Sequence, residues 1–152
     1  MAGAQALLIY DGFCPYCKIW RKAVDLIDVK DGLAYLPFYA SPAQKLLDAQ
    51  FGRRHRGFTI YLAEKGRIYW AHDAASRVAE HLRVPFGRDF LARVVYPAAA
   101  WAVTKTVGVW HRPHMPAVRK PFKDADGRTY AKLSGKAGRM LKNILRDTET
   151  LS

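Results

Sequence analysis

The sequence predicts an α/β domain followed by a basic, helical C-terminal extension. A short apolar run, an amphipathic helical pattern and a second apolar run open the chain, which is the order of a parallel β-α-β unit. Two further apolar runs flank a glycine-containing turn and indicate a β-hairpin, which leads into another helical pattern. Half of the 152 residues are hydrophobic, which is sufficient for one domain with a substantial core.

The opening β-α-β unit has clear boundaries. Residues 6–10, with the sequence ALLIY, are apolar enough for a buried strand, and Asp11-Gly12 ends them with a turn. Pro15 suits the first position of a helix, because its missing N–H would have no partner there. Apolar residues then recur at helical spacing, and residues 33–39 read as the second strand.

The next segments add a helix, a hairpin and a further helix. We expect a short helix to about Ala49, capped by Ser41 and with Pro42 at its first position. Residues 58–71 read as two strands joined at residues 64–67, and residues 72–82 read as a helix. The order is then β-α-β-α-β-β-α, with helices on both faces of a four-stranded sheet. This is the three-layer layout of a thioredoxin-like domain.

The pattern changes after residue 85. We therefore divide the chain into a thioredoxin-like domain over 1–85, a helical extension packed on or beside it over 86–110, and a basic, proline-containing linker with a last helix over 111–152. Ser134 is the expected cap of that helix, which ends near Arg146. The net charge is +12 and the pI about 10.0, which favours an anionic partner such as nucleic acid, a lipid surface or an acidic protein.

The two cysteines, Cys14 and Cys17, form a C-x-x-C motif at the expected start of the first helix. Unpaired N–H groups and the positive end of the helix dipole favour a thiolate at Cys14, the form of cysteine that attacks a disulfide. Cys17 lies one turn later on the same helix face, where it can resolve a mixed disulfide. The pattern therefore predicts thiol-disulfide exchange, with Cys14 as nucleophile and Cys17 as resolving thiol.

Two other readings of the cysteine pair stay open. In the first, both cysteines are buried structural thiols, as free cysteine often is. In the second, they are half of a zinc site, which needs about four ligands. No second C-x-x-C or H-x-x-x-H pair accompanies them. Further zinc ligands would have to come from the histidines: His55, His72, His81, His111 and His114.

The stretch YDGFCPYC resembles the opening signature of the DCC family of thiol-disulfide oxidoreductases, whose Asp-Cys-Cys pattern falls here on Asp11, Cys14 and Cys17. The Pro-Tyr dipeptide between the cysteines is also the one found in glutaredoxins. The hairpin and helix at residues 61–82 are similar to the second half of the DCC family. The resemblance covers about residues 6–84 and does not extend to the family's terminal Tyr-Arg-x-x-Ala-x-Asn-Arg pattern or to the basic tail.

The chain also departs from thioredoxins and glutaredoxins before the third strand. Those proteins place a cis-proline there, beside the reactive sulfur. The corresponding segment HRGFTIYL contains no proline, so Gly57, Phe58 or Thr59 occupies that position. The candidate substrate-contacting residues are those expected around the reactive sulfur or at the facing helix start and basic loop: Phe13, Pro15, Tyr16, Arg56, Phe58, Thr59 and Asp73.

Three of the candidate residues have two readings each. Asp11 either accepts the Cys17 proton during resolution or is a turn residue that accepts backbone N–H bonds. Asp73 either binds a ligand's ammonium group, as the corresponding helix start does in glutaredoxins, or is a carboxylate that stabilises the first helical turn. Arg56 and its basic neighbours either bind an acidic substrate such as glutathione or form a solvated charge run.

Together these features predict an enzyme, a dithiol oxidoreductase that reduces or oxidises a disulfide in a protein or a small thiol compound. No bound cofactor is expected, and glutathione is a candidate co-substrate. The alternative is a non-enzymatic adaptor whose thioredoxin-like scaffold docks an anionic partner through residues 86–152. The N-terminus lacks the pattern of a secretory signal, and the apolar stretch 94–104 is too short to cross a bilayer, so we expect a cytoplasmic protein.

Overall fold

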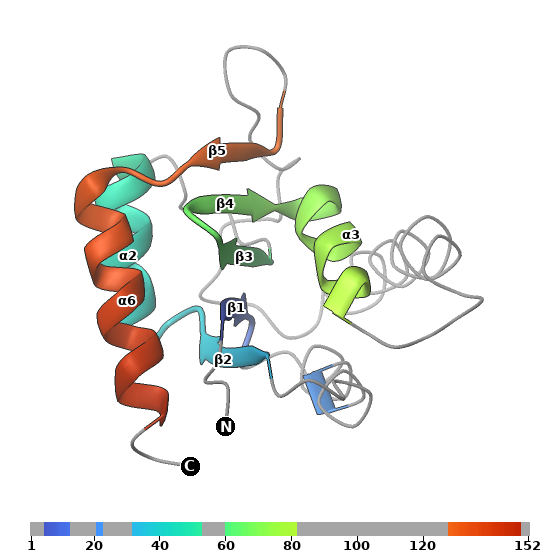
Figure 1. Ribbon diagram of the computed structural model, residues 1–152, viewed down its shortest axis with the longest axis horizontal. Helices are drawn as coiled ribbons and strands as arrows, with labels where there is room; N and C mark the ends of the chain where they lie inside the picture. Colours follow the sequence, from blue (N-terminus) through green and yellow to red (C-terminus); the bar gives the residue numbers. More distant parts are fainter. Residues whose placement is uncertain (1–4, 13–20, 23–31, 53–59, 82–127, 150–152) are drawn as a thin grey trace, which may run out of the picture.

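The computed structural model describes residues 5–12, 21–22, 32–52, 60–81 and 128–149 (Figure 1). They form an α/β structure with one mixed sheet of five strands in the order β2-β1-β3-β4-β5. The strands are β1 Ala6–Tyr10, β2 Leu33–Pro37, β3 Tyr61–Glu64, β4 Arg67–Trp70 and β5 Tyr130–Lys132. The helices within these ranges are α2 Ser41–Phe51, α3 Ala71–His81 and α6 Gly135–Glu149, and Arg21 and Lys22 are also helical.

The pairing of the first four strands confirms the parallel first pair and the antiparallel hairpin expected from the sequence. β1 and β2 are parallel, with Ala6 opposite Leu33. β3 is antiparallel to β1, and β4 is antiparallel to β3. β1 therefore lies inside the sheet, where all five of its residues are buried. A run without polar residues, ALLIY, is the composition that such an interior position requires.

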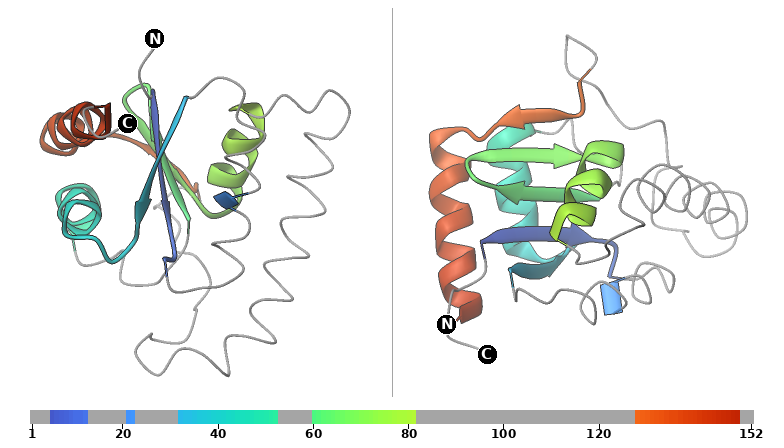
Figure 2. Two further views of the ribbon diagram at one scale, coloured as in Figure 1. Left: turned by 90° about the horizontal axis from the view of Figure 1, so that it is seen from below. Right: turned by 45° about the vertical axis from the view of Figure 1, so that its right-hand side comes forward.

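Successive residues of β1 face two different cores, as the alternation of a strand dictates. Leu7 and Ile9 belong to a core that also contains residues of α2 and α6. Ala6 and Leu8 belong to the other core, which contains residues of α3. Figure 2 shows the resulting three layers, with α2 and α6 side by side on one face of the sheet and α3 on the opposite face.

The hairpin between β3 and β4 turns at Lys65 and Gly66, within the turn predicted from the sequence. Both residues have a positive φ, +46° and +76°. This is the pattern of a type I′ turn, whose twist matches that of the flanking strands. Glycine adopts this conformation without steric cost, whereas Lys65 does not.

The boundaries of α2 and β2 differ from the expected ones. Ser41 does not cap α2: Ala40 occupies the N-cap position, no side chain caps the helix, and a proline in the first turn fixes its start. The helix also continues to Phe51, whose ring packs against Trp70 with centroids 5.1 Å apart. The second strand ends at Pro37 instead of residue 39, and proline is tolerated there because β2 is an edge strand.

The sheet has five strands, whereas four were predicted. The additional strand, β5, pairs antiparallel with β4 and places Tyr69 opposite Tyr130. Three residues with alternating exposure give too short a pattern to identify from the sequence. The last helix is confirmed as α6, and its predicted cap is present: the Ala137 N–H donates to Ser134 Oγ over 3.2 Å.

The connection between β5 and α6 is fastened to α2 by one glutamine. The Gln50 side-chain amide donates to the Lys132 carbonyl over 3.0 Å and accepts from the Ser134 N–H over 2.8 Å. α6 then packs along α2 and reaches β1, with Ala137 and Leu141 buried in the same core. Residues 130–149 therefore complete both the sheet and one of its two cores. Of the expected helix after Pro15, only Arg21 and Lys22 are described, and both are helical. The helices expected over 87–109 and the linker lie outside the described residues.

Candidate functional site

The end of β1, where the sequence places the C-x-x-C motif, is held closely. The Tyr10 carbonyl accepts a hydrogen bond from the Phe38 N–H over 2.7 Å, which ties the ends of β1 and β2 together. Gly12 lies so close to β2 that a Cβ at this position would be 3.0 Å from the Cβ of Pro37. Any larger residue would have to displace Pro37. The chain therefore leaves the sheet along a defined path immediately before the cysteine motif.

Asp11 occupies this same turn and is buried, with 2% of its surface exposed. Aspartate is rarely buried this completely, because removing a carboxylate from water is costly without specific partners. An aspartate that only forms a turn is usually solvent-exposed. A purely structural role in the turn therefore does not require the burial of Asp11. The sequence placed Asp11 correctly at the end of the first strand, but its burial was not predictable.

The start of α3 lies at the same end of the sheet. β3 begins next to the end of β1, with Tyr61 opposite Ile9, and β4 ends next to the start of β3. The Ala71 N–H then donates to the Ile60 carbonyl over 3.1 Å, which holds the start of α3 against the chain that enters β3. Ala71 has a φ of +51°, a strained conformation for alanine. The turn from β4 into α3 is thus tightly determined.

Asp73 stands in the first turn of α3, as predicted, and it has a partner from the C-terminal segment. The Thr129 hydroxyl donates a short hydrogen bond to Asp73 Oδ2. The Thr129 carbonyl accepts from the Trp70 N–H over 2.8 Å, so both ends of this residue are fixed. This contact favours the structural reading of Asp73 over the ammonium-binding reading, because one carboxylate oxygen is already used within the protein.

The structure describes two of the ten candidate site residues, Asp11 and Asp73, and places both at the end of the sheet where β1 and β4 terminate. Asp11 directly follows β1, Asp73 lies just after β4, and β3 separates these two strands in the sheet. The remaining candidates lie outside the described residues, and their roles stay predictions: Phe13, Cys14, Pro15, Tyr16, Cys17, Arg56, Phe58 and Thr59.

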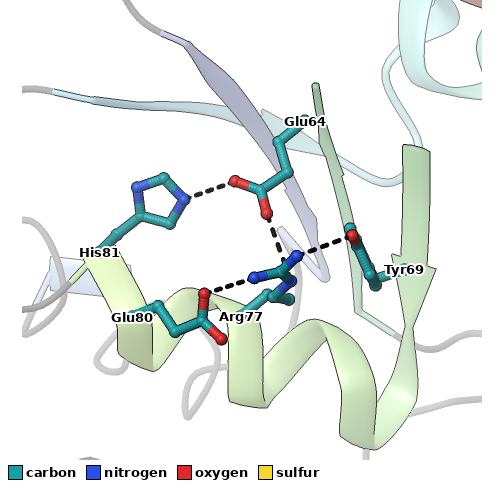
Figure 3. Close-up of polar contacts among 5 residues, drawn as sticks. All are labelled: Glu64, Tyr69, Arg77, Glu80 and His81. Carbon is teal, nitrogen blue, oxygen red and sulfur yellow. Dashed lines mark hydrogen bonds and ion pairs between the residues drawn. The ribbon is translucent and has the colours of Figure 1, made fainter. Parts of the chain in front are cut away.

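A second polar cluster, which the sequence did not reveal, lies at the opposite end of the sheet (Figure 3). Its centre is Glu64, the last residue of β3, which is 4% exposed. The His81 ring Nε2 lies 2.8 Å from Glu64 Oε2, and Arg77 Nε lies 3.5 Å from Glu64 Oε1. Arg77 also donates to the Tyr69 hydroxyl over 3.0 Å and pairs with Glu80. We call these five residues the Glu64 cluster.

The electrostatics of the Glu64 cluster keep its central carboxylate ionised. The hydrogen bond from His81 lowers the pKa of Glu64 below its ordinary value, and the charges of His81 and Arg77 act in the same direction against the opposing effect of burial. The pKa of Arg77 is raised by its hydrogen bonds to Tyr69 and Glu80. Both shifts favour the charged forms, so the cluster is a stable ion-pair network.

The Glu64 cluster joins α3 to the β3–β4 hairpin and contains no cysteine, serine or threonine that could act as a nucleophile. We therefore regard it as a structural link. The sequence carried one signal for it: Arg77 and His81 are four residues apart on a helix and share a face. Their partner was not recognised, because Glu64 was assigned to the hairpin turn.

The comparisons with known proteins identify no relative. No protein-family model matches the chain, and no match is found among curated proteins or solved structures. The resemblance to the DCC family therefore stays a prediction based on the motif. Among the described residues, no group of three or more His, Cys, Asp or Glu side chains could hold a metal ion. No helix in this part of the chain is long and apolar enough to span a membrane.

The end of the sheet at Asp11 is therefore the candidate functional site. It combines a fixed exit from a buried strand and a buried carboxylate, both within four residues of Cys14 in the sequence, with the start of α3 at the same end of the sheet. A buried carboxylate can accept a proton from a nearby thiol, and a fixed strand end can position a nucleophile. Neither property requires a metal or a bound cofactor.

Proposed function

We propose that the protein is a thiol-disulfide oxidoreductase that uses Cys14 and Cys17 as a dithiol-disulfide pair. The observation that carries the proposal is the position of the motif: Cys14 follows the buried strand β1 by four residues, and buried Asp11 is the first of them. A reactive thiol needs a fixed position and control of its protonation state. The end of β1 supplies a fixed starting point and a carboxylate for this purpose.

The sheet topology supports a thioredoxin-like arrangement for this site. The segment that contains the cysteines connects two parallel strands, β1 and β2, and a parallel connection of this kind normally includes a helix. The antiparallel β3–β4 hairpin and α3 follow in the predicted order. α2 and α3 lie on opposite faces of the sheet (Figure 2). In such a layout the C-x-x-C motif opens the first helix.

The proposed reaction has two steps. The Cys14 thiolate attacks one sulfur of a substrate disulfide, which breaks that S–S bond, releases one substrate thiolate and forms a mixed disulfide. Cys17 then transfers its proton to Asp11 and attacks the Cys14 sulfur. The second substrate thiolate leaves, and Cys14 and Cys17 remain joined. Two electrons pass from the enzyme dithiol to the substrate, and the reverse sequence oxidises a substrate dithiol.

Reduction of a substrate requires an external thiol to restore the enzyme dithiol, and glutathione is our candidate for this co-substrate. Arg56 is proposed to bind one of its carboxylates, with Phe13, Phe58 and Thr59 beside the sulfur. Asp73 was a candidate for the ammonium group of glutathione. Its bond from Thr129 instead supports a role in holding the C-terminal segment to α3. We therefore do not include Asp73 in the proposed binding site.

The first experiment measures the reactivity of Cys14 directly. Alkylation of the Cys17→Ser variant by iodoacetamide at different pH values is expected to give a pKa of about 6 for Cys14, against about 8.5 for a free thiol. The reduction of insulin by dithiothreitol should be accelerated by the wild-type protein and not by Cys14→Ser. A Cys14 pKa of about 8.5 or higher, together with no acceleration, would end the proposal.

The second experiment tests the role of Asp11. Asp11→Asn should slow resolution of the mixed disulfide about 100-fold, the lower end of the range for loss of a general base, and leave the first attack by Cys14 unchanged. Asp48→Asn, which removes an exposed carboxylate from α2, is the matched control and should affect neither step. If Asp11→Asn lowers thermal stability and leaves the resolution rate unchanged, Asp11 is only a turn residue.

A further inference from the structure

The outer face of α6 carries an unusual distribution of charge. Between Gly135 and Arg146 the sequence contains four cationic residues and no acidic residue. All four cationic side chains are exposed. At about 100° per residue they fall within an arc of about 120° and extend over about 15 Å of the helix. We call this surface the α6 basic face; it consists of Lys136, Arg139, Lys142 and Arg146.

Helix stability does not account for the α6 basic face. Consecutive cations of the face are three or four residues apart, which makes like charges neighbours on the helix surface and destabilises it. Lys136 lies in the first turn, where the positive end of the helix dipole disfavours a cation, and that turn contains no acidic residue. A helix selected only for packing on α2 would be expected to place acidic residues here.

The cations of this face are also not used within the part of the chain that the structure describes. Lys136, Arg139 and Lys142 have no ion pair or hydrogen bond there. Arg146 donates to the Asn143 side-chain oxygen over 2.6 Å and has no acidic partner. Unneutralised, closely spaced cations on a rigid helix are an arrangement to which an external polyanion can bind, with release of its own counterions.

The chemistry of the face selects among possible polyanions. A helix that binds a lipid surface inserts apolar side chains, and a protein interface has an apolar centre. The apolar side of α6 is buried against the core through Ala137 and Leu141. Among the described residues, the large hydrophobic side chains that are exposed are Tyr39 and Tyr130, neither of which belongs to α6. A cationic surface without exposed large apolar side chains is suited to a phosphate backbone, which needs no apolar contact.

We propose that the α6 basic face binds the phosphate backbone of double-stranded DNA without sequence specificity. Among the described elements, α6 lies at the outside beside α2, so its outer face forms a ridge (Figures 1 and 2). Such a ridge fits the groove of B-form DNA, about 12 Å wide, and is excluded from the narrow major groove of A-form RNA. This inference is independent of the thiol chemistry proposed above.

The test measures the affinity of the full chain for a fluorescein-labelled 24-base-pair DNA duplex by anisotropy, at 50 to 200 mM NaCl in reducing buffer. Four neutralised phosphates contribute about −3.6 to the slope of log K against log [salt], which is about 150-fold in affinity over this range. A variant with Gln at all four cationic positions should bind more weakly than wild type at 50 mM NaCl. Its slope should be shallower by about 3.6, so its affinity should lack this contribution of about 150-fold to the salt dependence between 50 and 200 mM.

A matched control distinguishes an effect of the position of the cations on α6 from an effect of the lower net charge. The variant Lys65→Gln, Arg67→Gln, Arg128→Gln, Lys132→Gln removes four exposed cations from the hairpin and β5, and it should keep the slope and bind within about fivefold of wild type. The single variant Arg139→Gln, which is expected to fold normally, should reduce the slope by about 0.9. Thermal unfolding followed by circular dichroism checks that each variant is folded.

Three results would overturn the proposal. Loss of DNA binding in the control variant, with the α6 variant unaffected, would place the DNA site on the hairpin and β5. Binding to phosphatidylserine vesicles that depends on the α6 basic face, without such dependence for DNA, would make the partner a membrane. Tighter binding of an RNA duplex of the same sequence would exclude the B-form groove as the target.

Discussion

Substitutions of Glu64 and of its partner His81 are expected to have unequal effects on the stability of the protein. His81→Ala removes the 2.8 Å contact and leaves the 4% exposed Glu64 with Arg77 at 3.5 Å. Glu64→Gln keeps the shape of the side chain and an acceptor oxygen for His81. It leaves His81 and Arg77, whose side chains are 17% and 35% exposed and therefore accessible to water. The loss of folding free energy therefore depends on whether the charged group that remains is buried or accessible to water.

The magnitudes follow from the burial of the group that remains. A hydrogen bond to a charged group contributes about 1.5–3 kcal/mol, and a buried charge that loses its only partner costs about 3–5 kcal/mol. Because Arg77 still faces Glu64 in His81→Ala, we expect a loss of about 2–3 kcal/mol. For Glu64→Gln we expect about 1 kcal/mol, the value of a neutral hydrogen bond. In a chain of this size each kcal/mol lowers Tm by about 2–4 °C.

The pH dependence of Glu64→Gln provides an independent check. The hydrogen bond from His81 lowers the pKa of Glu64 in the folded state below 4.5, its ordinary value. A carboxyl group with a lowered folded-state pKa stabilises the protein fully above its unfolded pKa, and this contribution is lost as the pH falls through the folded pKa. The stability difference between wild type and Glu64→Gln should therefore be constant above about pH 5 and shrink below it.

Urea unfolding followed by far-UV circular dichroism at pH 7 and pH 3.5 measures both effects. Glu80→Gln is the matched control, because Glu80 pairs with Arg77 at the surface with its side chain 55% exposed. It should cost less than about 0.5 kcal/mol. The reasoning would be refuted if Glu64→Gln destabilised the protein at pH 7 as much as His81→Ala, or if its cost were the same at both pH values.

Three further substitutions test features of the sheet and of the candidate site. Thr129→Val removes the hydroxyl that donates to Asp73 and should lower the free energy of unfolding by about 1–2 kcal/mol, measured by thermal unfolding. An accompanying decrease in the KM for glutathione would show instead that Asp73 binds a ligand. Lys65→Asn places a residue that tolerates positive φ in the type I′ turn and should raise Tm by about 2–4 °C. An unchanged Tm would show that Lys65 does not strain the turn. Gly12→Ala introduces a Cβ at 3.0 Å from the Cβ of Pro37 and should destabilise the protein by about 1–3 kcal/mol. An unchanged Tm would contradict the close packing of Gly12 against Pro37.

The features predicted correctly from the sequence are those determined by local patterns. ALLIY and the hairpin were found because apolar runs end at turn residues. The cap of the last helix was found because Ser134 directly precedes the helical pattern. The proline in the first turn of α2 was also recognised, but the cap was wrong by one residue: Ala40 occupies it and no side chain caps the helix.

The features that were missed depend on contacts between distant residues. β5 becomes a strand only through its pairing with β4, from which it is separated by residues 71–129. Thr129 and Asp73 are 56 residues apart, so no spacing rule indicates their hydrogen bond. The candidate site was located from the motif and the end of β1, while the burial of Asp11 required the assembled sheet.

The dependence of the core on α6 has a consequence for how the protein is made. Strand β1 and helix α2 are synthesised before residues 130–149, which contribute to the core that β1 and α2 share. During translation the part of this core that α6 supplies is missing until residues 130–149 have left the ribosome. Domains with such long-range closure fold late and expose aggregation-prone surface in the meantime. Chains truncated before β5 should thus need chaperone binding to remain in solution.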